Sequence, residues 1–252
     1  MITFSDCWFR YTDRQILAGI NLSVAAGECV AVMGQNGCGK STLLQAAAGL
    51  IPLQQGRIVM HGLERRSNVA TEHQLRRSSC YLPANTWLPG GLSCREYLAG
   101  VGELYERTAQ EISRCSAALL TAFHLEANQV TDALSTGQQK KLALCGALIS
   151  DADCYILDEP FVGGLDPAGI LTLQHVMQEL AARSDVTILF ATPVPQIVGQ
   201  LAHRVAVLHE GVILACDTVP ALCARYSATD LAEVMSHITP PDDAVALAEL
   251  IP

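Results

Sequence analysis

The sequence predicts an α/β fold in which helices cover both faces of a buried sheet, and three observations carry this prediction. The apolar run 29–33 leads into the glycine-rich segment 34–42, and a helix-like stretch follows. A second apolar run, residues 154–157, ends in the acidic pair Asp158 and Glu159. Half of the 252 residues are hydrophobic but only 5% are aromatic, which suits a sheet buried on both sides.

The glycine-rich segment has the pattern Gly-x-x-x-x-Gly-Lys-Ser between a predicted strand and a predicted helix, which is the setting of a phosphate-binding P-loop. Its glycines let successive backbone N–H groups converge on an anion, and the helix N-terminus adds partial positive charge. We expect Lys40 to contact the β- and γ-phosphates and the Ser41 hydroxyl to bind Mg²⁺. The residues expected to bind the nucleotide here are Gly34, Asn36, Gly37, Cys38, Gly39, Lys40, Ser41 and Thr42. The sequence therefore predicts binding of a nucleoside triphosphate.

The acidic pair after the second strand predicts the catalytic groups. Asp158 ends the strand and is placed to hold Mg²⁺, directly or through water. Glu159 follows and can orient or deprotonate the attacking water. Two acids after a strand can also be a solvated sheet edge, but the upstream P-loop favours the catalytic interpretation.

Composition limits the possible partners. The net charge is −9 and the chain has three lysines, which argues against nucleic acid as a partner. No apolar run is long enough to cross a bilayer and the N-terminus lacks a signal pattern, so we expect a cytoplasmic protein. The ten cysteines are scattered without a C-x-x-C pair, which predicts reduced thiols used as small buried hydrophobes. Cys38 is the exception, because it lies within the phosphate loop and is open to modification there.

The remaining segments predict a core interrupted by helices. Residues 1–28 alternate apolar and polar side chains and predict an antiparallel ribbon. From about residue 86 to 150, helix-like spacing predicts an inserted helical subdomain. The individual segments are a strand and turn at 56–62, helices at 96–106, 111–123 and 139–149, a tight turn into a helix at 163–167, a strand at 186–191, and a hairpin of 205–208 with 212–215. Ser135, before Gly137, is either only an N-cap or part of a turn that presents backbone N–H groups to an external anion.

Over residues 1–225 the chain resembles the ATP-binding subunits of ABC transporters. Residues 34–42 are similar to the Walker A motif, residues 154–159 to Walker B with its catalytic glutamate, and residues 134–138 to the family signature. The resemblance implies a P-loop NTPase core with an N-terminal antiparallel β-part and an inserted α-helical subdomain. Its divisions are a core of residues 1–85 and 151–225, a subdomain of residues 86–150, and a C-terminal tail of residues 226–252.

The resemblance also implies cofactors and partners. ATP and Mg²⁺ are expected at a head-to-tail dimer, in which Ser135, Gly137 and Gln138 of one subunit face the ATP of the other. Tyr11 falls where the family stacks an aromatic ring on adenine, although a tyrosine between two strands can also simply pack. Transmembrane subunits would hold the dimer on the inner face of the cell membrane. The segment 217–235 resembles ATPases of small bacterial exporters, which favours export.

Four departures from the family pattern are visible. Ala84 stands where a glutamine is expected, with Asn85 beside it, and Pro193 stands where a histidine is expected. Thr136 replaces a signature glycine, and the link 161–164 is one residue longer than usual, which would displace Asp166 from the dimer interface. We do not expect His203 to replace the missing histidine.

These departures predict an asymmetric role. The chain should bind ATP and hydrolyse it slowly, and lend its signature to a stronger site of a second ATPase subunit. A homodimer, and an ATP-dependent regulatory switch with little turnover, remain alternatives. Trp87 either marks a docking surface for membrane subunits or packs inside the subdomain. Residues 236–252 are expected to form a mobile end or a short helix.

Overall fold

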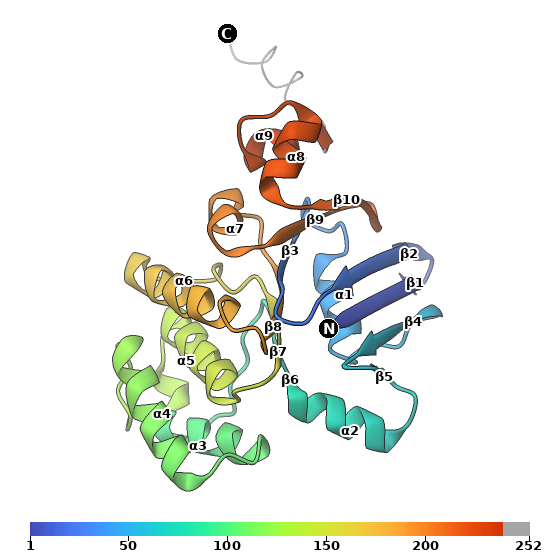
Figure 1. Cartoon of the computed structure of the whole chain (residues 1–252). Helices are drawn as coiled ribbons and strands as arrows, with labels where there is room; N and C mark the ends of the chain where they lie inside the picture. Colours follow the sequence, from blue (N-terminus) through green and yellow to red (C-terminus); the bar gives the residue numbers. More distant parts are fainter. Residues whose placement is uncertain (239–252) are drawn as a thin grey trace.

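The computed structural model describes residues 1–238 and contains two β-sheets with helices around them (Figure 1). The larger sheet has the strand order β10-β9-β3-β8-β7-β6. All its neighbours pair parallel except β10, which pairs antiparallel with β9. Its strands are β3 (Cys29–Met33), β6 (Ser79–Leu82), β7 (Cys154–Asp158), β8 (Thr187–Ala191), β9 (Arg204–His209) and β10 (Val212–Asp217). The predicted α/β class is confirmed.

The smaller sheet is the antiparallel part predicted at the N-terminus. Its strand order is β2-β1-β4-β5, and all of its pairings are antiparallel. The strands are β1 (Ile2–Tyr11), β2 (Arg14–Val24), β4 (Gln55–Met60) and β5 (Leu63–Glu64).

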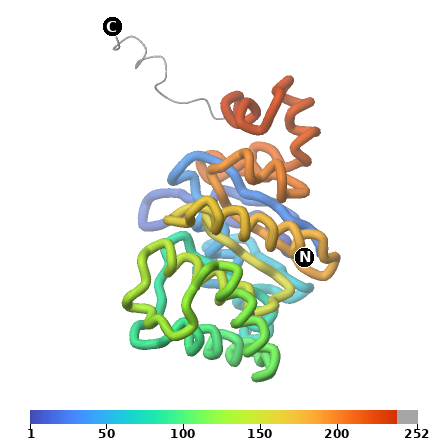
Figure 2. The backbone as a smooth tube through the Cα atoms, turned by 90° about the vertical axis from the view of Figure 1, so that its left-hand side faces the viewer, coloured from blue at the N-terminus to red at the C-terminus, as the bar shows by residue number. Residues whose placement is uncertain are grey.

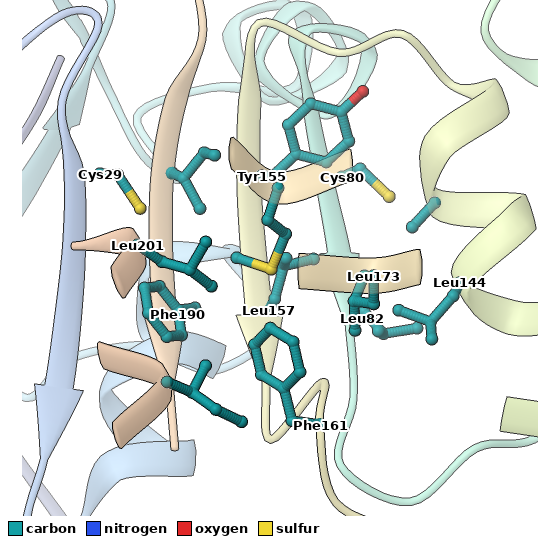
Figure 3. Packing of buried hydrophobic residues seen from close by; sticks show 14 of the residues in the cluster. Cys29, Cys80, Leu82, Leu144, Tyr155, Leu157, Phe161, Leu173, Phe190 and Leu201 are labelled. Atoms are coloured by element: carbon teal, nitrogen blue, oxygen red, sulfur yellow. The ribbon is translucent and has the colours of Figure 1, made fainter. Parts of the chain in front are cut away.

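The parallel strands divide their side chains between two cores. In β3, Val30 and Val32 enter the core shared with the antiparallel sheet, whereas Ala31 and Met33 enter the core under the later helices. Strands β7 and β8 divide in the same way, as the period-2 alternation of a strand requires. Figure 3 shows part of the second core, where Leu157, Phe161 and Phe190 gather beneath helices.

Helices cover both faces of this sheet. On the first core lie α1 (Lys40–Ala47) and α2 (Val69–Ser78). On the second core lie α3 (Cys94–Leu104), α4 (Ala109–Ala122), α5 (Thr136–Ile149), α6 (Pro167–Ala181), α7 (Pro195–Leu201), α8 (Val219–Tyr226) and α9 (Leu231–Ile238). Figure 2 shows α3–α5 gathered at one end of the molecule and α8 and α9 at the other.

The predicted helical subdomain consists of α3, α4, the short 3₁₀ turn η1 (Thr131–Ala133) and α5. Each of the three α-helices starts with a capping box, in which a Ser or Thr side chain and an acid or amide three residues later satisfy each other's backbone N–H groups. The pairs are Ser93–Glu96, Thr108–Glu111 and Ser135–Gln138. These caps fix where the helices begin, while the subdomain boundaries at residues 86 and 150 stay a prediction.

Several elements differ from the sequence prediction. Helix α5 begins at Thr136 rather than at residue 139, because Ser135 caps it. Helices α2 and α7 were not predicted, since α2 buries only Leu75 and α7 is short. The tail contributes α9, whose Leu231 and Val234 enter the second core. The remaining part of the predicted mobile end or short helix, residues 239–252, lies outside the described residues.

Two further predictions concern composition. All ten cysteines are free thiols, and most of them are buried. Burial raises the pKa of the Cys29 and Cys154 thiols to about 12. Within residues 1–238, no helix is both long and apolar enough to cross a membrane.

Helix α6 offers a matched test of the second core. Leu173 is 1% exposed and Leu171, on the same helix, is 66% exposed. We expect Leu173→Ala to lower the free energy of unfolding by about 2–5 kcal/mol because it leaves a cavity, and Leu171→Ala to change it by less than about 0.5 kcal/mol. Denaturant unfolding of both variants measures this, and equal losses would contradict the assigned packing.

Candidate nucleotide-binding site

The predicted site residues meet at one edge of the larger sheet. Because the strands are parallel, the segments that follow them leave at the same edge, where ligands of α/β proteins bind. Ala191 of β8 pairs with Val32 of β3 on one side and with Asp158 of β7 on the other. The phosphate loop after β3 and the acids at the end of β7 therefore flank the same strand.

The phosphate loop is curled as its motif predicts. Gly39 precedes α1 with φ 110°, a left-handed conformation that favours glycine. A Cβ at Gly34 would lie 2.1 Å from the backbone oxygen of Leu208, so no larger residue fits there. Lys40 is 5% exposed, and its Nζ donates hydrogen bonds to the backbone oxygens of Gly34 (2.9 Å) and Gln35 (3.0 Å). The ammonium is thus held at the loop.

Two cavities border this loop. One of about 270 Å³ is lined by Arg14, Ile16, Asn36, Gly37, Gly39, Lys40, Ser41, Thr42 and Glu159. The other cavity, of about 390 Å³, is also lined by Arg14 and extends to the β9–β10 turn at Glu210. Sequence reasoning missed Arg14 and Ile16, which reach the loop from β2. Their only signal was their place just after Tyr11 in the predicted ribbon.

Asp158 has the surroundings of a metal ligand. The residue is 2% exposed, and its Oδ1 is buried without a hydrogen-bond partner among the described residues. Burial raises the pKa of this carboxyl, and the neighbouring charge of Glu159 raises it further. The Ser41 hydroxyl and the charges of Lys140 and Lys40 lower the pKa, but the net change is upward. A buried carboxylate oxygen that lacks a donor and lies beside a hydroxyl offers the oxygen ligands that Mg²⁺ prefers. Asp158 and Ser41 therefore fit the predicted metal.

Glu159 is held by its backbone. It has φ 47°, unusual for a residue with a side chain, and its N–H donates to the backbone oxygen of Ala191 (2.9 Å). Its half-buried side chain lines the smaller cavity with Lys40 and Ser41. This position is compatible with the predicted action of Glu159 on water, which stays a prediction.

Tyr11 is at the end of β1 and is 49% exposed. Its ring meets that of Phe9 edge-on, with centroids 4.7 Å apart. Tyr11 is outside the lining of both cavities. Its stacking on adenine stays a prediction.

The signature residues lie at the start of α5, where Ser135 and Thr136 are exposed and Gly137 and Gln138 are half-buried. Ser135 accepts a hydrogen bond from the backbone N–H of Gln138 (3.3 Å), and Gln138 Oε1 accepts one from the N–H of Ser135 (3.0 Å). A Cβ at Gly137 would lie 2.3 Å from the backbone oxygen of Gly164, so the longer link packs directly on the signature. Both the capping and the anion-binding interpretations of Ser135 remain compatible with this geometry.

Two positions that depart from the family pattern, 84 and 193, carry no polar side chain. Ala84 has no polar side chain, but its backbone oxygen accepts a hydrogen bond from Lys140 Nζ (3.3 Å). Asn85 and Pro193 are exposed. His203 lies at the opposite end of β3, where its Nδ1 accepts from the Cys29 N–H (2.9 Å), so it cannot replace the missing histidine.

Asp166, which follows the longer link, interacts within its own chain. Its carboxylate pairs with Lys141 Nζ (2.9 Å) and accepts a hydrogen bond from the Gly169 N–H (2.9 Å), so Asp166 caps α6.

Trp87 is 80% exposed, so the alternative that it packs inside the subdomain is wrong.

The buried charge of Asp158 predicts opposite effects on stability and on binding. We expect Asp158→Asn to raise the free energy of unfolding of the nucleotide-free chain by about 1 kcal/mol, because it removes a desolvated charge. The same variant should lose the Mg²⁺ dependence of ATP binding. Denaturant unfolding and ATP titrations with Mg²⁺ or EDTA measure the two effects. Asp153→Asn, at the exposed residue just before β7, is the control, and retained Mg²⁺ dependence in Asp158→Asn would contradict the assignment.

Comparison with known proteins gives one family. The family model described as ABC transporter matches residues 17–162. The chain is 31% identical to the cobalt import ATP-binding protein of Salmonella typhi, over 85% of this chain and 79% of that protein. It is also 31% identical to the Nod factor export ATP-binding protein I of Paraburkholderia xenovorans, over 100% of this chain and 80% of that protein.

Solved structures of ATP-binding subunits and cassettes have the same fold as this chain. An ATP-binding subunit of an ABC transporter superposes with a TM-score of 0.86 at 26% identity, over 95% of this chain and 99% of that one. A dimeric ATP-binding cassette bound to ADP and phosphate shares the fold, with a TM-score of 0.77 at 20% identity, over 86% and 98% of the two chains. The chain therefore belongs to the ATP-binding subunits of ABC transporters, a family of ATPases.

Proposed function

We propose that this chain is the weaker ATPase subunit of a heterodimer that drives export through separate membrane subunits. One observation carries the proposal: the nucleotide face is incomplete at Ala84 and Pro193, whereas the signature face keeps Ser135 and Gly137. In a head-to-tail dimer, each chain contributes its nucleotide face to one site and its signature face to the other.

On its own nucleotide face the chain retains the binding groups. Lys40 would neutralise phosphate charge, Ser41 and Asp158 would hold Mg²⁺, and Glu159 would orient the attacking water. Pro193 offers neither a side-chain donor nor a backbone N–H to the γ-phosphate. Loss of one preorganised donor typically slows such a reaction about 10²–10³-fold. Tight binding with slow turnover follows.

The signature face supports a site on the partner. Ser135 and Thr136 are exposed at the N-terminus of α5, a helix of 14 residues. Helix N-termini present backbone N–H groups and partial positive charge to anions. The capping box already orders this turn, so little further ordering would be needed to bind a partner's ATP.

Export and membrane docking are supported by two separate observations. The alignment with the Nod factor export protein runs through the C-terminal tail, whereas that with the cobalt import protein covers 85% of the chain. The exposed Trp87 follows Ala84 closely and is suited to dock a membrane subunit at the inner face of the cell membrane.

A regulatory switch is the second candidate. It would bind ATP, dimerise and control a partner without sustained turnover. Ala84 and Pro193 favour it, while Glu159 in the smaller cavity favours hydrolysis.

Steady-state ATPase assays separate these functions. We expect the chain alone to turn over about 10²-fold more slowly than the same chain with a second ATPase subunit encoded beside it. Glu159→Gln in this chain should leave most of the heterodimer rate, because that rate belongs to the partner's site. Fast turnover alone, abolished by Glu159→Gln, would instead indicate a homodimeric motor, and no turnover in either case would indicate the switch.

Docking through Trp87 is tested by co-purification with the membrane subunits. We expect Trp87→Ala to weaken their association at least about tenfold, as for an aromatic residue at the centre of an interface. ATP binding by the isolated chain should be unchanged. Leu171→Ala, which removes another exposed apolar side chain, on α6, serves as the control; equal association of both variants would rule out docking at Trp87.

A further inference from the structure

Arg14, the first residue of β2, lies at the nucleotide site although it belongs to none of the sequence motifs. It lines both of the cavities that border the phosphate loop. A Cβ built on Gly37 would lie 4.0 Å from Nη2 of Arg14, and no other atom outside the immediate chain neighbours comes as near. The guanidinium therefore faces the phosphate loop from a strand of the smaller sheet.

The backbone of β2 holds the arginine at this place. Two residues further along the strand, the backbone oxygen of Ile16 would lie 2.8 Å from a Cβ at Gly39, so the strand touches the loop directly. Two hydrogen bonds fasten the same parts to the β9–β10 turn. The Ala18 N–H donates to the backbone oxygen of Gly211 (2.8 Å), and the Gly211 N–H donates to that of Cys38 (3.2 Å). Strand, turn and phosphate loop are thus joined before any ligand binds.

The charge of Arg14 is available to a ligand. Within residues 1–238 its exposed side chain has no hydrogen bond or ion pair, although Glu159 lines one of the two cavities and Glu210 the other. Lys40, which shares the lining of the smaller cavity, instead donates to backbone oxygens of the loop. A guanidinium is always charged and presents several N–H donors in a planar fork that matches phosphate oxygens. Its place beside a phosphate loop suits a polyanion.

We propose that the Arg14 guanidinium binds the phosphate chain of ATP as a second protein cation beside Lys40. This inference rests on the proposed nucleotide face of the chain. Hydrogen bonds between a guanidinium and phosphate oxygens are stronger than those between neutral groups. Pro193 offers no donor to the phosphates, so Arg14 adds from β2 a positive charge that the family motifs do not supply. The role is in binding, and tight binding with slow turnover remains the expected behaviour.

The test compares Arg14→Gln with Arg10→Gln in the full chain, with ATP and inorganic tripolyphosphate as ligands in the presence of Mg²⁺. Competition with a fluorescent ATP analogue gives the dissociation constants. We expect Arg14→Gln to weaken the binding of both ligands by the same factor, about five- to twentyfold, because a charged hydrogen bond is lost. Arg10 is exposed on β1 and lines neither cavity. Arg10→Gln removes the same charge and should change either constant less than about twofold.

Tripolyphosphate separates a phosphate contact from a contact with the base. Tyr11 pairs with Arg14 across the β1–β2 hairpin, so a guanidinium that stacked on adenine would affect ATP alone. A loss confined to ATP, or no loss for either ligand, would overturn the proposal. Added salt should weaken ATP binding more steeply in the wild type than in Arg14→Gln, because salt screens charge contacts. Equal salt dependence of the two proteins would also overturn it.

Arg14→Lys keeps the positive charge and should stay within about threefold of the wild type, since lysine also binds phosphate as a point charge. A loss as large as that expected for Arg14→Gln would refute the charge-based role, and this variant decides the case if Arg14→Gln does not fold. A wild-type chain that binds neither ligand would overturn the nucleotide face together with this inference. Pairing with a second ATPase subunit does not enter, because every measurement uses the chain alone.

Discussion

The parallel alignment of β3, β8 and β7 is the constraint on which the rest of this structure depends. It brings the carboxyl ends of three strands from distant parts of the sequence to one edge, with Ala191 paired to both Val32 and Asp158. The two cores maintain this alignment, because slipping a strand by one residue would exchange its side chains between them. The phosphate loop and the acids are therefore positioned by packing far from any ligand.

The sequence predicted what is encoded locally. The phosphate loop, strand β3 and the acids at the end of β7 are contiguous patterns in the sequence. Arg14 was not predicted as a site residue, because it reaches the site from β2 and only the folded chain brings it there. The sequence also left open whether Trp87 is exposed, since it does not show which side of a loop faces solvent.

The lysines of this chain show how closely charge is tied to the site. All three are buried, at 5% for Lys40, 1% for Lys140 and 8% for Lys141, so every exposed side chain with a permanent positive charge in residues 1–238 is an arginine. A buried ammonium is costly unless it is paired or hydrogen-bonded. Lys40 bonds to the phosphate loop and Lys141 to Asp166, whereas Lys140 donates to a single backbone oxygen. A compact point charge is retained at each of these places despite its desolvation.

Helix α5 connects these features, because its first turns carry both the signature cap and Lys140. Its N-terminus is ordered by the exchange between Ser135 and Gln138, so the turn that would meet a partner's ATP exists before any partner binds. One turn further on, the Lys140 ammonium donates to the backbone oxygen of Ala84, the second residue after β6. The same helix therefore ties the signature turn to the end of the strand that lies beside β7 in the larger sheet.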